Sequence, residues 1–105
     1  MRQVAILGIG QTKIDEHWNK SLREVGGEAA FAAMQDAGVE KVDSLFVGNM
    51  LSSMISGQNQ LGAFFSDWIG LWKQEAVKIE AACGSGAAAF RSALMAVASG
   101  DVESA

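Results

Sequence analysis

The stretch EAVKIEAACGSGAAAF, residues 75–90, decides the fold, because it changes from strand-like to helix-like character around one cysteine. Residues 75–82 begin with an alternation of apolar and polar side chains and end fully apolar, which predicts a strand. The small and apolar residues at 84–100 predict a helix. Cys83 stands at the junction, so we expect it at the N-terminus of a helix that follows a buried parallel strand.

Two interpretations of Cys83 follow from the residues alone. A helix N-terminus has unpaired N–H groups and a positive partial charge, which stabilise a thiolate. Gly84 and Gly86 would let the backbone turn sharply and leave room for a substrate carbonyl, and the nearby N–H groups suit an oxyanion. The alternative is a small packing residue, since cysteine is among the most buried residue types. Spacing and composition leave both interpretations open.

Ser85 is predicted to be a helix-start residue and not a nucleophile. The sequence GSG at 84–86 lacks the G-x-S-x-G form of the hydrolase nucleophile elbow. The G-x-G of GIGQTK at 8–13 is a weak dinucleotide-binding signal, because the third glycine is absent and no helix follows at once. We expect a plain strand-to-loop turn there.

The rest of the chain continues the alternation of strands and helices. In chain order it predicts a buried strand at 3–9, a helix at 21–37, a strand at 43–50, a polar loop at 51–60 and a helix at 61–70. The helix at 21–37 is well marked, because Ser21 and Glu24 form a capping box and Gly38 follows its end. The order strand, helix, repeated three times, predicts an α/β fold, βαβαβα, with parallel strands and right-handed crossovers.

Two predicted helices imply close neighbours. Gly26 and Gly27 inside the helix at 21–37 cost roughly 1 kcal/mol each relative to alanine, so we expect another backbone to pack close to them. Between Ala87 and Ala98 only Arg91 and Ser92 are polar, so the last helix needs cover on nearly every side. We therefore expect a natural domain larger than this chain, or a second subunit.

Composition excludes several classes of protein. The 105 residues suffice for one domain, and the net charge of −4 argues against a nucleic-acid partner. The longest apolar run is too short to span a bilayer, and the N-terminus does not have the pattern of a signal peptide. The single Cys83 forbids an intrachain disulfide, and one cysteine with one histidine cannot build a zinc site. We expect a cytoplasmic protein without a metal.

Three separated segments together resemble thiolases. They are VAILGIGQTK at 4–13, DSLFVGNMLSS with GQNQLGAFF at 43–65, and EAACGSGAAAF with ALMAVASGD at 80–101. The resemblance covers essentially the whole chain, and it is nearest to archaeal and bacterial enzymes related to the sterol-carrier thiolase type. It implies a partial thiolase-like N-terminal domain over residues 1–105, truncated before the remaining strands. It also implies Cys83 as the acylated nucleophile, with Gly84, Ser85 and Gly86 binding substrate.

The implied reaction is Claisen-type acyl transfer or its reverse, thiolysis of a 3-ketoacyl-CoA. Cys83 takes an acyl group from one acyl-CoA, which splits a difficult step into two easier ones. The resemblance implies coenzyme A thioesters as substrates, no cofactor, and a homodimer or homotetramer. It also implies general bases in Gly-His-Pro and Cys-x-Gly segments of the C-terminal half, which this chain lacks. We interpret His17 as a solvated surface residue, so we expect the 105-residue chain to be inactive alone.

Other interpretations remain open beside this one. The chain is alternatively a non-catalytic assembly subunit or fragment, or part of a related condensing enzyme such as a ketoacyl synthase or hydroxymethylglutaryl-CoA synthase. The segment at 56–60, SGQNQ, lines a neighbouring subunit's active site according to the resemblance, or Ser56 simply caps a helix. Trp18, Trp68 and Trp72 are interpreted as core or interface anchors.

Overall fold

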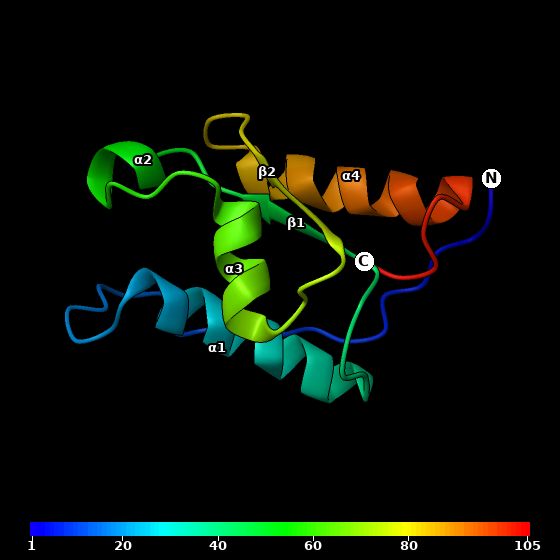
Figure 1. The fold of residues 1–105 in the computed structure, drawn as a ribbon, viewed down its shortest axis with the longest axis horizontal. Coiled ribbons are helices and arrows are strands. Elements are labelled where there is room, and N and C mark those ends of the chain that lie inside the picture. The colour runs from blue at the N-terminus through cyan, green and yellow to red at the C-terminus, as the bar shows by residue number, and fades with distance from the viewer.

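A computed structural model describes residues 1–105 and contains four helices and two strands. The elements are α1 (Leu22–Ala37), β1 (Ser44–Gly48), α2 (Ser52–Ile55), α3 (Leu61–Ile69), β2 (Glu75–Ile79) and α4 (Ser85–Ser99). Figure 1 shows the two strands running between α4 at the top and α3 and α1 below. The predicted helices at 21–37, 61–70 and 84–100 are confirmed, while the short α2 lies inside the predicted polar loop.

The sheet consists of two parallel strands. β1 and β2 pair in register from Ser44 opposite Glu75 to Gly48 opposite Ile79. The connection between them contains α3, as a parallel pair requires a long crossover. The α/β class and the parallel pairing are therefore confirmed, and the carboxyl ends of both strands lie at one edge.

The predicted strand at 3–9 is wrong. No residue before Ser44 belongs to a strand, and Ile6, Leu7 and Ile9 are 68–74% exposed. The segment instead follows α1: any side chain at Gly8 or Gly10 would clash with the α1 backbone. The two extended residues from Gly8 to Gly10 span about 6.6 Å, and four residues of a helix span about 6 Å. The two glycines therefore contact successive turns of α1. The residue types favour a strand, but the segment has no partner strand to pair with.

The N-terminus of α1 has the predicted capping box. The Glu24 amide donates to the Ser21 hydroxyl at 3.2 Å, and the Ser21 amide donates to the Glu24 carboxylate at 2.6 Å. The Ser21 amide, followed by the Ser21 hydroxyl, holds the pKa of the Glu24 carboxyl below its usual value, because hydrogen bonds to the carboxylate favour the charged form. Gly38 ends the helix in the left-handed conformation, as expected for the residue after a helix.

The glycine pair inside α1 receives aromatic rings and not the expected backbone. A Cβ at Gly26 would clash with the Phe65 ring, and one at Gly27 would lie 2.5 Å from the Trp68 indole nitrogen. Both rings come from α3, so the two glycines let α3 pack closely on α1. Trp18 is 88%, Trp72 78% and Trp68 44% exposed, so none of them is a core residue of this chain, and their role as interface anchors remains a prediction.

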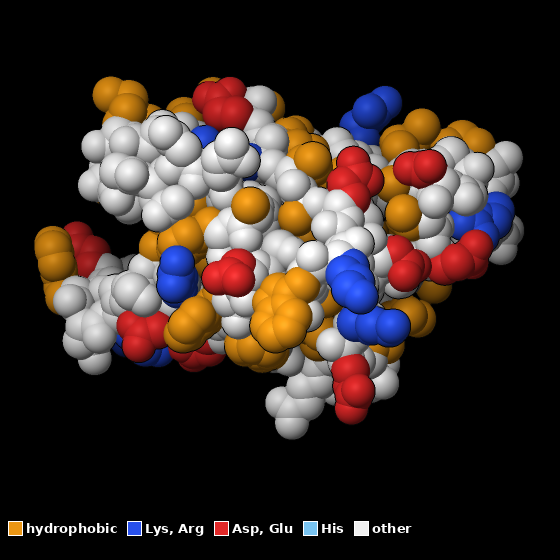
Figure 2. Space-filling model, in the orientation of Figure 1, with side chains coloured by type: hydrophobic (Ala, Val, Ile, Leu, Met, Phe, Trp, Pro, Cys, Tyr) orange, Lys and Arg blue, Asp and Glu red, His pale blue; other side chains and the backbone are white.

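The core is small for a chain of this length. Only 12 of 105 residues are buried, with Leu61 and Leu71 the most completely enclosed large side chains. On α4, Phe90 is 56% exposed, and Leu94 and Met95 are 37–38% exposed. Figure 2 shows apolar side chains reaching the surface between acidic and basic ones on one face. The expectation that α4 needs more cover than this chain supplies is therefore confirmed. No helix is long and apolar enough to cross a membrane.

Candidate functional site

Cys83 lies at the edge of the sheet where both strands end. β2 ends at Ile79, three residues earlier than predicted, and α4 begins at Ser85. Cys83 is exposed and stands two residues before α4, which confirms its predicted place at a helix N-terminus. The preceding strand is only half buried, so the expectation of a buried strand is wrong in this respect.

A tight turn over residues 81–85 presents the thiol. The Gly84 amide donates to the Ala81 carbonyl at 2.9 Å, and the Ser85 amide donates to the Ala82 carbonyl at 3.1 Å. Ala82 itself has a φ of +49°, a left-handed conformation that residues with a Cβ seldom adopt. Cys83 therefore lies within this turn, and its side chain is exposed.

The buried Ser85 side chain stabilises this turn with two hydrogen bonds. Its hydroxyl accepts a hydrogen bond from the Ala81 amide at 2.9 Å and donates one to the Ala82 carbonyl at 2.7 Å. Ser85 is 4% exposed, so the group is enclosed by the protein. The prediction that Ser85 starts the helix is confirmed.

The first turn of α4 offers unpaired amides beside the thiol. The helix has no side-chain cap, and its first intrahelical acceptor is Gly84, whose carbonyl binds the Ala88 amide at 2.9 Å. The amides of Cys83, Gly86 and Ala87 make no hydrogen bond within the protein. The space above Gly86 is open, since nothing lies within 4 Å of where its Cβ would be. An exposed sulfur, free donors and open space thus occur together.

Gly48 supports this site from β1. A Cβ at Gly48 would lie 2.6 Å from the Ser85 carbonyl carbon and 2.8 Å from the Gly86 Cα. Only glycine lets the first turn of α4 lie this close to the strand end, since real Cβ contacts are longer. The sequence did not predict the close contact at Gly48 or the positive φ of Ala82. A glycine that closes a strand is a usable signal for close approach, whereas nothing in an alanine predicts positive φ.

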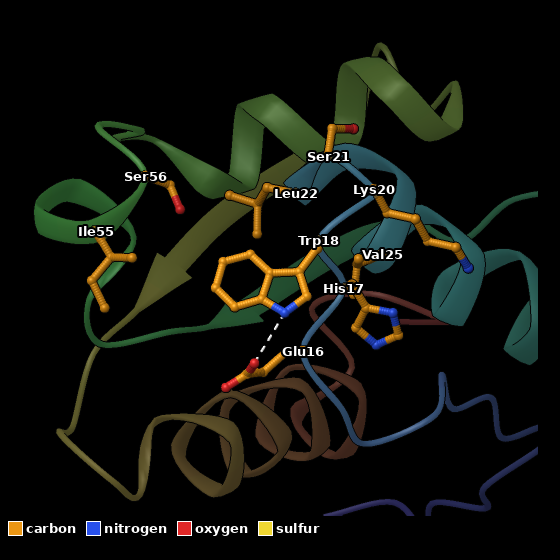
Figure 3. A pocket seen from close by; sticks show the side chains of 9 residues that line it. All are labelled: Glu16, His17, Trp18, Lys20, Ser21, Leu22, Val25, Ile55 and Ser56. Atoms are coloured by element: carbon orange, nitrogen blue, oxygen red, sulfur yellow. Dashed lines mark hydrogen bonds between the residues drawn. The ribbon is translucent and has the colours of Figure 1, made fainter.

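A pocket near the N-terminus of α1 is not lined by Cys83. It has a volume of about 500 Å³ and is lined by residues of the loop after the N-terminal segment, of α1 and of α2: Glu16, His17, Trp18, Lys20, Ser21, Leu22, Val25, Ile55 and Ser56. Figure 3 shows the Trp18 indole, which donates to Glu16 at 3.0 Å, with Leu22 beside it. His17 is half buried, and its Nε2 lies 2.7 Å from the Lys13 carbonyl. The structure therefore does not bring His17 and Cys83 into one pocket.

The segment at 56–60 takes no part in capping α3. Ser56 is the C-terminal cap of α2, and its amide donates to the Ser52 carbonyl, so Ser56 does cap a helix, at the end of α2 and not at the start of α3. Gln60 occupies the residue before α3 with a φ of +57° and no side-chain cap bond. The Gln58 side chain donates to the neighbouring Asn59 carbonyl, and its backbone amide donates to the Ser52 carbonyl at 3.1 Å. The interpretation that this segment faces a neighbouring subunit remains a prediction.

The chain is similar to known proteins over most of its length. Residues 4–105 match the family described as "Thiolase, N-terminal domain", so the chain belongs to the thiolase family. It is 43% identical over 102 residues to an acetyl-CoA acetyltransferase of Methanothermobacter thermautotrophicus, covering 95% of this chain and 27% of that protein. It is 40% identical to an acetyl-CoA acetyltransferase of Methanocaldococcus jannaschii, covering 95% of this chain and 26% of that one. The chain spans about a quarter of these relatives' length.

Proposed function

We propose that this chain provides the nucleophile of a thiolase-type acyl transfer, in which Cys83 accepts an acyl group from an acyl-CoA thioester. Family membership and two relatives named acetyl-CoA acetyltransferase support this proposal. The single observation that carries it is the exposed Cys83 beside three unpaired backbone amides at the start of α4.

The proposed first step follows from this arrangement. The Cys83 thiolate attacks the thioester carbonyl carbon, and the carbonyl oxygen becomes an oxyanion. One or more of the backbone amides of Cys83, Gly86 and Ala87 donate to that oxygen, because these amides have no other partner in the chain. The C–S bond to coenzyme A then breaks, coenzyme A leaves as its thiolate, and the acyl group remains on Cys83.

The open backbone around Cys83 suits an acyl carbonyl. We propose that substrate lies against Gly84 and Gly86, since no atom occupies the space above Gly86. A side chain at either position would narrow the approach to the sulfur. Ser85 lies beneath this surface and not on it.

The condensation step needs a base that this chain does not place beside Cys83. Removal of an α-proton by a general base contributes about 10² to 10⁴-fold to such reactions. His17, the only histidine, lines a different pocket. We propose that the bases lie elsewhere in the intact protein and that this chain alone carries out acylation without condensation.

We also propose a homodimer or homotetramer. The apolar side chains of α4 that stay exposed, Phe90, Leu94 and Met95, require further polypeptide against them. Light scattering of the intact protein tests the assembly, and a stable, well-folded monomer would contradict it.

Cys83 is the only cysteine of residues 1–105, so an adduct on a peptide from this region identifies the acylated residue. The intact protein is incubated with acetyl-CoA, digested and analysed by mass spectrometry. We expect a mass increase of one acetyl group on the Cys83 peptide and none in the Cys83→Ser variant, since serine is a far poorer nucleophile at neutral pH. An adduct that persists in Cys83→Ser would disprove the proposal.

A further inference from the structure

We propose that Ser85 is a positioning residue. Its hydroxyl holds Ala82 in the left-handed conformation and thereby fixes the orientation of Cys83 relative to the free amides at the start of α4. The inference rests on the proposed function, because the reaction it serves is acylation of Cys83. It assigns Ser85 a role through the backbone instead of through contact with substrate.

The hydrogen bonds of Ser85 lie on both sides of the strained residue. Its hydroxyl accepts from the amide of Ala81, the residue before Ala82, and donates to the carbonyl of Ala82 itself. One buried oxygen thus connects the peptide group before Ala81 with the peptide group after Ala82, and the backbone between these two groups contains the φ and ψ angles of Ala82. A non-glycine residue in this region persists only where the surroundings enforce it.

The same side chain also fixes the position of the Cys83 thiol relative to α4. Ser85 is the first residue of α4, and its backbone rests on Gly48. Fixing Ala82 relative to Ser85 therefore fixes Cys83, which lies between them, relative to the free amides of Gly86 and Ala87. Without the hydroxyl, Ala82 is free to relax to negative φ, which would rotate Cys83 away from these donors.

The burial of Ser85 separates this role from substrate binding. The residue is 4% exposed, and its only proton is donated to the Ala82 carbonyl. A hydroxyl in this state has no donor left for a substrate. Ser85 must therefore affect acylation indirectly, by fixing the backbone of Ala82 and Cys83.

The test uses the intact protein and a second-site variant. Ser85→Ala removes the hydroxyl, while Ala82→Gly removes the steric cost of positive φ, because glycine adopts it readily. We expect Ser85→Ala to lower the saturated rate of Cys83 acetylation on the order of 10- to 100-fold, with the half-saturating acetyl-CoA concentration unchanged. We expect Ser85→Ala/Ala82→Gly to recover most of that loss. Ser92→Ala is the matched control, since its hydroxyl only donates to the Ala88 carbonyl within α4, and its rate should be unchanged.

A second readout separates this inference from the proposed function. The rate of Cys83 alkylation by iodoacetamide does not depend on acyl transfer, and it should change in Ser85→Ala and return in the double variant. If the wild-type protein is never acetylated but this pattern holds, the proposed function fails and the positioning role stands. Acetylation without rescue by Ala82→Gly, or a raised half-saturating concentration alone, overturns the positioning role. If Ser85→Ala does not fold, a double variant that folds and reacts supports it, and one that does not overturns it.

Discussion

Gly48 of β1 and Ser85 of α4 approach each other so closely that no side chain fits between them. A Cβ on Gly48 would lie 2.6 Å from the carbonyl carbon of Ser85, closer than real side chains come. β1 and the turn that carries Cys83 are therefore joined by backbone packing. The position of the thiol depends on the absence of a side chain 35 residues earlier in the chain.

Gly48→Ala should displace the first turn of α4. The added methyl group meets backbone atoms, which cannot move aside as a flexible side chain would. We expect a loss of roughly 1–3 kcal/mol in the free energy of unfolding, as for other overpacked sites, together with slower acetylation of Cys83. Chemical denaturation and mass spectrometry measure the two effects. Unchanged stability and an unchanged rate would show that the contact does not constrain α4.

Gly86→Ala should separate stability from reactivity. The space above Gly86 is open, so the methyl group causes no clash, and alanine favours the helix by roughly 0.5–1 kcal/mol. If substrate occupies that space, acetylation of Cys83 should slow although the protein becomes more stable. An equal or faster acetylation rate would remove Gly86 from the substrate-binding surface. The variant also serves as the stability control for Gly48→Ala.

The capping box of α1 should make stability depend on acid pH. The pKa of Glu24 is lowered in the folded protein by the Ser21 amide and hydroxyl, so the folded state holds the proton less tightly than the unfolded state. The stabilisation is complete above the ordinary glutamate pKa and is lost as the pH falls through the folded value. Glu24→Gln keeps an acceptor for Ser21 but does not titrate.

Thermal unfolding of both proteins across acid and neutral pH measures this effect. The wild type should exceed Glu24→Gln in melting temperature at neutral pH, and the difference should shrink as the pH falls. A constant difference across the range would mean that the Glu24 charge adds nothing to the cap.

The 105-residue chain should show no steady-state thiolysis of acetoacetyl-CoA. His17 lines a pocket without Cys83, and its Nε2 carries a proton toward the Lys13 carbonyl, because a carbonyl only accepts. We expect at most stoichiometric acylation of Cys83. Turnover above the thiol background that disappears in His17→Ala would identify His17 as the base and refute this expectation.

Local patterns in the sequence predicted the elements whose ends are set by nearby residues. The start of α1 followed from Ser21 and Glu24, and the end of α3 followed from Gly70, because caps act over a few residues. The parallel pairing of β1 and β2 followed from the intervening helix. The place of Cys83 followed from the change of pattern at one residue. Each of these rests on interactions within a short stretch of chain.

Predictions of features that depend on residues distant in the sequence were wrong or incomplete. The segment at 3–9 has strand-like residues but lies along α1, since a strand forms only where another strand can pair with it. Gly26 and Gly27 indicated close packing, but only the structure showed that Phe65 and Trp68 fill the space.

The sequence by itself determined the α/β class, the approximate bounds of α1, α3 and α4 and the junction at Cys83, because propensity, capping and hydrophobic period are local properties. Only the tertiary structure decided that Cys83 is exposed, that Ser85 points inward to hold Ala82, and that Gly48 supports α4. These facts depend on which segments meet in space. Ala82 shows the reason most clearly: its left-handed φ is unfavourable locally, and it is the contacts of the folded chain that maintain it.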